Sequence, residues 1–70
     1  MFTAIEIKHI DNELNMIVTG VINVNLFNID VWYISDGALI IEIGGKAWET
    51  TLTVEQFIAL LNESLTITGN

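Results

Sequence analysis

The sequence predicts an α+β fold: a five-stranded, bent antiparallel β-meander with one C-terminal α-helix packed on one face. From Leu14 to Leu26 every even position is apolar or glycine, which is typical of a strand with one buried face. Short breaks rich in Asp, Asn and Gly separate five apolar runs, and the last apolar segment has helical spacing instead. A small SH3- or OB-like barrel with a capping helix is the alternative architecture.

The breaks define five strands within one domain that spans residues 1–70. We expect the strands at about residues 2–10, 13–27, 31–35, 38–43 and 46–52. A two-residue turn at Asp11-Asn12 opposes Ile7 to Met16 and Ile5 to Val18. A slip of one residue would move a whole strand to the other face, so agreement among the turns supports the arrangement.

The next two turns connect the strands in sequential order. A three-residue loop over residues 28–30 opposes Leu26 to Trp32, which pairs the second strand with the third. Asp36-Gly37 is a strong hairpin signal, because a type I′ turn needs positive φ at both central residues. This turn opposes Trp32 to Ile41 on the buried face.

Two glycine positions leave more than one interpretation. If Gly44-Gly45 is a two-residue loop, Trp48 joins the core, whereas with Lys46 in the loop Trp48 lies on the outer face. We favour the two-residue loop, because the core of a small sheet needs large side chains. Gly20 keeps the strand in phase, so it marks a bend, a bulge or a close approach and not a turn. We expect a bend that curls the sheet, with a ligand approaching the bare backbone as the alternative.

A helix is expected over about residues 54–65. Thr53 and Gln56 have the spacing of a capping box ahead of an apolar run. The apolar side chains form one stripe at helical spacing: Val54, Phe57, Ile58, Leu61 and Leu65. This stripe can cover the buried face of the sheet, and the tail over residues 66–70 is expected to fray.

The composition is acidic, which limits the classes of partner that we expect the chain to bind. Nine Asp and Glu residues stand against two lysines with no arginine, for a net charge of −7. Arginine is the usual ligand of phosphates and guanine edges, so direct nucleic-acid binding is not expected. A protein partner with a basic surface fits better. The alternative is that the scattered carboxylates only keep an apolar chain soluble.

Cysteine content and hydropathy indicate the cellular compartment in which we expect the protein. The chain has no cysteine, which excludes a disulfide framework and a thiolate metal site. No apolar run approaches the roughly 18 residues of a membrane span. The segment Met1–Glu6 lacks the basic region of a signal peptide. We therefore expect a cytoplasmic protein without membrane contact.

No residue set predicts catalysis, a cofactor or a metal. His9, the single histidine, is expected on the buried face near the sheet end, opposite Leu14. An ordinary, partly exposed residue is favoured there over a metal ligand or a pH switch. Asp11 and Glu13 flank the first turn without the spacing of a calcium loop. No nucleophile and base can be paired, so we expect a protein that is not an enzyme.

The outer face of the sheet is the most informative feature for function. The phasing leaves apolar side chains there among polar ones, and a candidate interface comprises Ile17, Val21, Phe27, Val31, Tyr33, Ile40 and Glu42. Aromatic and β-branched residues with a polar rim are typical of a protein interface. The alternative is a scatter of exposed apolar residues that needs no explanation.

These observations predict a small, acidic, non-enzymatic interaction module that forms a homo-oligomer. A chain of 70 residues without disulfides or metals has only a small core, and association would add stability. Size, charge and an Ile- and Asn-rich composition without arginine favour a phage-type inhibitor of a host enzyme or defence system. A structural subunit of a virion or other assembly, and a protein that sequesters a small molecule, are the alternatives.

Overall fold

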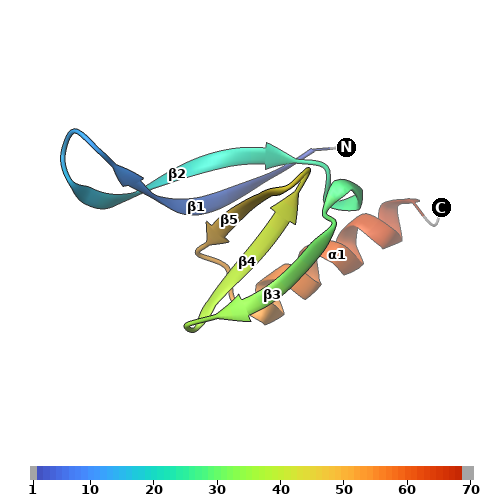
Figure 1. Ribbon diagram of the computed structural model, residues 1–70. Coiled ribbons are helices and arrows are strands. Elements are labelled where there is room, and N and C mark those ends of the chain that lie inside the picture. Colours follow the sequence, from blue (N-terminus) through green and yellow to red (C-terminus); the bar gives the residue numbers. More distant parts are fainter. Residues whose placement is uncertain (1, 69–70) are drawn as a thin grey trace.

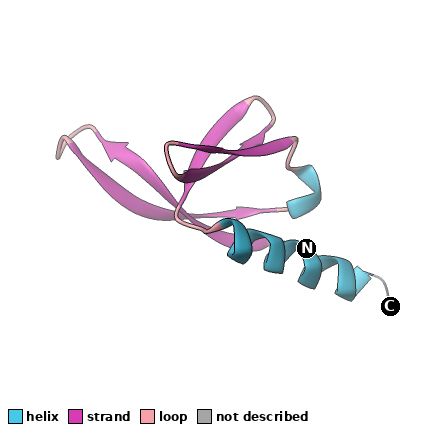
Figure 2. Ribbon diagram, turned by 90° about the horizontal axis from the view of Figure 1, so that it is seen from below, coloured by secondary structure: helices cyan, strands magenta, loops and turns pink. Residues whose placement is uncertain are grey.

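The computed structural model describes residues 2–68 and confirms the α+β fold. The elements are β1 (Thr3–Asp11), β2 (Met16–Val24), a short 3₁₀ turn η1 (Leu26–Asn28), β3 (Val31–Ser35), β4 (Ala38–Ile43), β5 (Lys46–Thr50) and α1 (Val54–Thr68). All five strands belong to one antiparallel sheet, and α1 packs against one face of it (Figures 1 and 2). The sheet is open, so the barrel alternative is wrong.

The strand order is β2-β1-β5-β4-β3. β3, β4 and β5 follow one another as a meander, and the β1–β2 hairpin joins this meander through β1. The contact between β1 and β5 consists of the pairs Ile7↔Thr50 and Lys8↔Glu49. The predicted pairing of the second strand with the third is wrong, because β2 and β3 form the two opposite edges.

The connection from β2 to β3 explains this order. The side chain of Asn25 accepts a hydrogen bond from the backbone N–H of Phe27 at 3.0 Å and starts the 3₁₀ turn. Asp30 then forms two hydrogen bonds with the end of β4 and the β4–β5 turn. Its N–H donates to the carbonyl of Glu42 at 2.8 Å, and its carboxylate accepts from the N–H of Gly44 at 2.9 Å. The connection is therefore a 3₁₀ turn that is held to the end of β4, and not the predicted three-residue hairpin loop.

The two later hairpins form as predicted. Asp36 and Gly37 both have positive φ, and their turn pairs Ser35 with Ala38. Gly44-Gly45 also has positive φ at both residues and forms a two-residue loop, which pairs Ile41 with Trp48 (the register places Trp48 on the core face). β3 and β4 have the predicted bounds.

The first hairpin has a wider turn than predicted. Asp11 pairs with Met16, which leaves residues 12–15 in the turn, and Asn15 has a φ of 53°. The carboxylate of Asp11 accepts hydrogen bonds from the backbone N–H groups of Glu13 at 2.9 Å and Leu14 at 3.1 Å. These bonds pair two backbone N–H groups of the turn. Because residues 12–15 belong to the turn, β2 begins only at Met16. The predicted two-residue turn is therefore wrong.

The wider turn shifts the register by four residues. Ile5 pairs with Ile22 instead of Val18, and Ile7 pairs with Gly20 instead of Met16. Because four is an even number, each side chain stays on its predicted face. The predicted strand over residues 13–27 contracts to Met16–Val24, and the predicted strand over 46–52 ends at Thr50.

The helix begins as predicted. The N–H of Gln56 donates to Oγ1 of Thr53 at 3.1 Å, and the N–H of Thr53 donates to Oε1 of Gln56 at 2.9 Å, which completes the capping box. The helix continues to Thr68, beyond the predicted end at about residue 65. Residues 69–70 and the side chain of Leu65 lie outside the described part.

The core lies between α1 and the sheet. Its buried apolar side chains are Ile5, Ile7, Val24, Leu26, Leu39, Ile41 and Phe57. The Phe57 ring lies edge-on to Trp32, with ring centroids 5.2 Å apart. Ile58, predicted on the helix stripe, is 42% exposed, and Leu60 packs against the core instead. The covered stripe is therefore rotated slightly from the predicted one.

The molecule is elongated. Its extents are 46 × 22 × 20 Å and its radius of gyration is 13.0 Å, against about 11 Å for a compact chain of this length. The β1–β2 hairpin accounts for this shape, since its turn lies far from α1 (Figure 1). We call residues 9–21 the ribbon: they comprise the end of β1 beyond its last pair with β5, the turn, and the first part of β2. We call β3, β4, β5 and α1 the body.

Candidate interaction surface

Strand pairing defines the face of the sheet that α1 does not cover. Residues directly opposite one another share a face, and one row crosses all five strands: Thr19, Lys8, Glu49, Ile40 and Tyr33. The core residues Ile41 and Leu39 alternate with this row, so they point toward α1. We call the face that carries the row the outer face.

The candidate interface residues fall into two separate groups. The ribbon cluster contains Ile17 and Val21 together with Ile10, which pairs with Ile17. The β3 cluster contains Val31, Tyr33, Ile40 and Glu42. Four strand spacings of about 4.8 Å place the two edge strands roughly 19 Å apart. Phe27 belongs to neither group, because it lies in η1 outside the strands, where it is exposed.

A charged pair separates the two clusters. Nζ of Lys8 lies 3.9 Å from Oε2 of Glu49, and both side chains are about half exposed. An exposed pair of this kind contributes little to stability. It does interrupt the apolar surface of the outer face, which is therefore not one continuous patch.

A hydrogen bond organises the β3 cluster. The hydroxyl of Tyr33 donates to Oε2 of Glu42 at 2.8 Å. This bond raises the pKa of Tyr33 above its ordinary value, with smaller contributions in the same direction from burial and from the negative charge of Glu42. The bond orients the Tyr33 ring over the outer face at the β3 edge. The cluster therefore presents one aromatic ring beside one carboxylate.

The ribbon is apolar on both faces. On the outer face Ile10 and Ile17 oppose each other and are 66% and 68% exposed. Met16 on the other face and Leu14 in the turn are also mostly exposed, although their even positions predicted core residues. Trp32 and Ile34 in the body are likewise more exposed than predicted. A helix of 15 residues is about 22 Å long, too short to cover the whole 46 Å molecule.

His9 and Gly20 form a local contact on the ribbon. His9 pairs with Val18, not with Leu14 as predicted, and its side chain is exposed. A Cβ atom added at Gly20 would lie 3.4 Å from Nε2 of His9. This distance is an ordinary van der Waals contact, and the pairing with β1 continues through Gly20 in register, so the structure shows no bulge there. Within residues 2–68, no group of three His, Asp or Glu side chains lies close enough to hold a metal ion.

A cleft of about 550 Å³ opens between the ribbon and β5. It forms because β1 and β5 share only two residue pairs. His9 and Gly20 line it from the hairpin, and Lys46 and Trp48 line it from β5. Nζ of Lys46 lies 4.2 Å from the centroid of the Trp48 ring, which places a cation over the aromatic face. The cleft is open and has mixed polarity.

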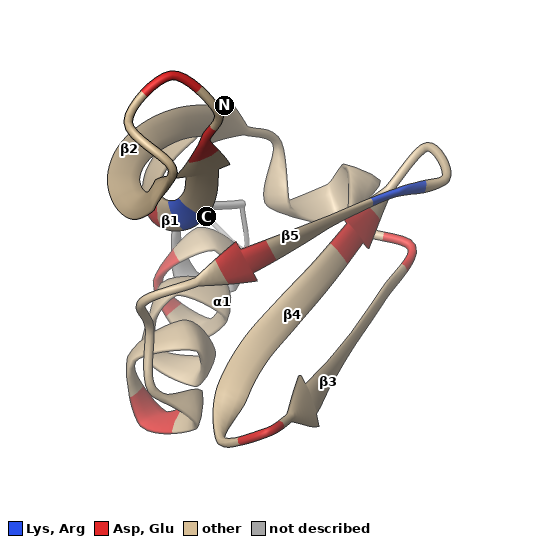
Figure 3. Cartoon of the chain, turned by 60° about the vertical axis from the view of Figure 1, so that its left-hand side comes forward, with Lys and Arg blue, Asp and Glu red and all other residues tan. Residues whose placement is uncertain are grey.

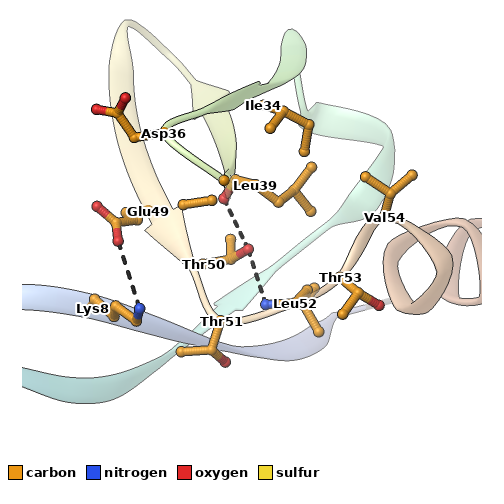
Figure 4. Close-up of a pocket in the computed structure, with 12 residues that line it drawn as sticks. Lys8, Ile34, Asp36, Leu39, Glu49, Thr50, Thr51, Leu52, Thr53 and Val54 are labelled. Carbon is orange, nitrogen blue, oxygen red and sulfur yellow. Dashed lines mark hydrogen bonds and ion pairs between the residues drawn. The ribbon is translucent and has the colours of Figure 1, made fainter.

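A second hollow of about 480 Å³ lies between the β3–β4 turn and the segment that joins β5 to α1 (Figure 4). The hydroxyl of Thr50 lies in its wall, donates to the carbonyl of Leu39 at 2.9 Å and accepts from the N–H of Leu52 at 3.3 Å. The hydroxyl of Thr50 is thus paired within the chain both as donor and as acceptor. Asp36 and Glu49 add carboxylates at the rim.

The charges are spread unevenly along the chain. Acidic residues occur on the hairpin turn, the strands and α1 (red in Figure 3). The two basic residues of the sequence are Lys8 and Lys46. One long stretch, Leu14–Ile29, carries no charged residue. This stretch contains all of β2, including Thr19, which the phasing did not single out. The absence of charge from the stretch is the sequence signal that would have identified this strand as a surface.

Comparison with known proteins provides no relative. No family model, curated protein or solved structure matches the chain. Within residues 2–68, no helix has the length and apolar character that crossing a membrane requires. The surface described above is therefore the basis for a functional proposal.

Proposed function

We propose that the protein is a small, acidic, non-enzymatic interaction module that self-associates through its ribbon. The observation that carries this proposal is the exposure of apolar side chains on both faces of the ribbon, including Ile10, Ile17 and Met16. A two-stranded ribbon is marginally stable in water by itself. Contact with a second molecule buries these side chains and stabilises the ribbon.

The accessible surface of the chain supports the same proposal. It amounts to 4934 Å², against roughly 4,400 Å² for a compact monomer of this mass. The excess belongs with the elongated shape that the ribbon produces. A homo-oligomer that covers the ribbon removes this excess.

The acidic surface suits a protein partner with a basic surface. With a net charge of −7, the chain attracts such a partner over a distance and repels nucleic acid. The concrete form that we propose is a phage-type inhibitor that binds a host enzyme or defence protein in the cytoplasm. Small size and a surface rich in carboxylates support this form.

Self-association is tested by sedimentation velocity over a wide range of protein concentration. We expect a discrete homo-oligomer, and Ile17→Asp should weaken it because the substitution places a charge in the ribbon cluster. Ser35→Asp, opposite Ala38, adds the same charge at the opposite edge and serves as the control. A monomer at every concentration would contradict the proposal. Open growth without a fixed size would instead favour a virion or other assembly subunit.

Partner binding is tested with a panel of purified host nucleases and defence enzymes that carry basic substrate grooves. We expect one of them to be bound and inhibited, with affinity that falls as salt concentration rises. A matched surface of opposite charge, made by replacing several of the exposed carboxylates with lysine, should lose the interaction. Absence of binding and inhibition across the panel would contradict the inhibitor proposal.

A further inference from the structure

We infer that two copies of this chain pair antiparallel along β2 and join their sheets into one continuous ten-stranded sheet. This inference rests on the proposed self-association and specifies its surface. β2 is an edge strand of nine residues that pairs only with β1 within the described part of the chain. An edge that is long, apolar and free of charge and proline is a ready template for another strand.

Charge selects β2 as the edge that meets a second copy. Two copies of a chain with a net charge of −7 repel each other, and this repulsion is least where no charges meet. Residues 14–29 carry none, so β2 can align with β2 of a second copy without opposing carboxylates. The pairing therefore requires no compensating basic residues.

The other edge is unsuited to the same contact. β3 has only five residues, and Asp30 and Asp36 flank it. Antiparallel self-pairing of β3 would bring Asp30 of one copy beside Asp36 of the other at both ends of the contact. Like charges directly opposite each other are destabilising. The two edges of the sheet are therefore not equivalent.

Side-chain pairing favours one register, with Thr19 of the two copies opposite each other on the two-fold axis. On the outer face this register places Ile17 opposite Val21 of the second copy. The pairs on the other face are Met16 with Ile22, Val18 with Gly20, and their symmetry equivalents. Every apolar residue of the strand core then meets an apolar residue or glycine, and the two threonines meet each other. Such cross-strand pairs stabilise a sheet.

The neighbouring registers are less favourable. Centring the axis on Gly20 places Ile17 opposite Asn23 and Val21 opposite Thr19 of the second copy. Each of these contacts sets an apolar side chain against a polar one on the outer face. In the preferred register Ile17 of each copy packs beside Val21 of the other, so the second copy covers part of each ribbon cluster.

The test uses Thr19→Glu in the full chain. Lys8 lies opposite Thr19 within the hairpin, so the new carboxylate has a favourable neighbour in the isolated chain. In the paired form the two carboxylates meet on the axis. We expect the dissociation constant of the dimer to rise about tenfold or more, which corresponds to about 1.4 kcal/mol. Ser35→Glu, which adds the same charge to the β3 edge, is the matched control and should leave the constant unchanged.

A cysteine scan checks the register independently, because the chain has no native cysteine. Oxidised Thr19→Cys should form a disulfide-linked dimer in high yield, and oxidised Ser35→Cys should remain unlinked. If the parent chain associates but Thr19→Glu weakens it no more than Ser35→Glu, pairing along β2 is overturned while self-association stands. A parent chain that is monomeric at every concentration overturns both. Circular dichroism spectra of the variants establish that each one is folded.

Discussion

The body and the ribbon are built from the same alternating pattern but differ in what covers them. In the body, α1 closes one face of the sheet, so that Leu39, Ile41 and Phe57 are almost fully buried. In the ribbon, no described element covers either face, and Leu14 and Ile17 remain mostly exposed. The difference shows that alternation identifies the face a strand can bury. Whether burial occurs depends on the reach of the covering layer.

This comparison separates local stability from association. The free energy of folding comes mainly from apolar area removed from water, and most of that removal takes place in the core between α1 and the sheet, outside the ribbon. The apolar side chains of the ribbon contribute only when another molecule covers them. Substitutions in the body should therefore change unfolding at any concentration. Substitutions on the ribbon cluster should act chiefly through the oligomer.

The largest expected effect is that of Phe57→Ala in the body. The Phe57 side chain is fully buried and contacts Trp32, so its removal should lower the free energy of unfolding by about 3–5 kcal/mol. Because the net stability of so small a domain is also about 3–5 kcal/mol, we expect loss of the cooperative thermal transition. Ile58→Ala, at an exposed position of the same helix, is the control. Equal effects of the two substitutions would mean that α1 does not form the core.

An intermediate effect is expected for Gly37→Ala in the β3–β4 turn of the body. Gly37 has a φ of 78°, and nothing lies within 4 Å of an added Cβ, so the cost is conformational and not steric. A non-glycine residue in this region costs about 1–2 kcal/mol. Urea denaturation at one fixed protein concentration measures the change. A stability equal to that of the parent would contradict the type I′ turn.

Local turn chemistry explains which parts of the fold were predictable. Asp36-Gly37 and Gly44-Gly45 each determine a hairpin by themselves, and both hairpins have the predicted register. The capping box at Thr53 likewise depends on residues three positions apart. In contrast, the carboxylate of Asp11 bonds to two backbone N–H groups and selects a four-residue turn. Both turn lengths keep the same faces, so alternation does not distinguish them.

The strand order was harder to predict from the sequence, because it depends on contacts between residues far apart in the chain. β1 meets β5 through residues more than 40 positions apart, as in the pair Ile7↔Thr50, and no local signal encodes that contact. The expected arrangement of the candidate interface was wrong for the same reason, because it assumed that the second strand pairs with the third. Val21 and Tyr33 were expected on neighbouring strands, whereas the structure places them at opposite edges. The outer face was identified correctly by phase, but its continuity required the strand order.

A smaller effect of opposite sign is expected for Gly20→Ala in the ribbon. Gly20 lies in an extended strand, unlike Gly37, and an added Cβ would meet the His9 ring at 3.4 Å, an ordinary contact distance. Replacing glycine by alanine in a strand interior should then stabilise the chain by about 0.5–1 kcal/mol. Urea denaturation at the same fixed concentration compares the two glycine variants. Destabilisation as large as that of Gly37→Ala would show that the strand needs glycine at this position for another reason.

The smallest effect concerns the polar pair of the β3 cluster. The hydrogen bond to Glu42 raises the pKa of Tyr33, so Glu42→Gln should lower that pKa toward its ordinary value. Tyr33 is the only tyrosine, and its phenolate absorbance during an alkaline titration reports it alone. Glu49→Gln removes a carboxylate from the same face without touching Tyr33, and it should leave the titration unchanged.

The direction of the accompanying stability change follows from linkage. A raised pKa in the folded state means that folding favours the protonated hydroxyl. This contribution is fully present below the pKa of the unfolded chain and is lost as pH rises through the raised pKa. The parent should therefore lose stability over that alkaline interval, and Glu42→Gln should lose less. If both chains respond identically, the Tyr33–Glu42 bond does not persist in solution, and the β3 cluster lacks the fixed ring orientation that distinguishes it from the ribbon cluster.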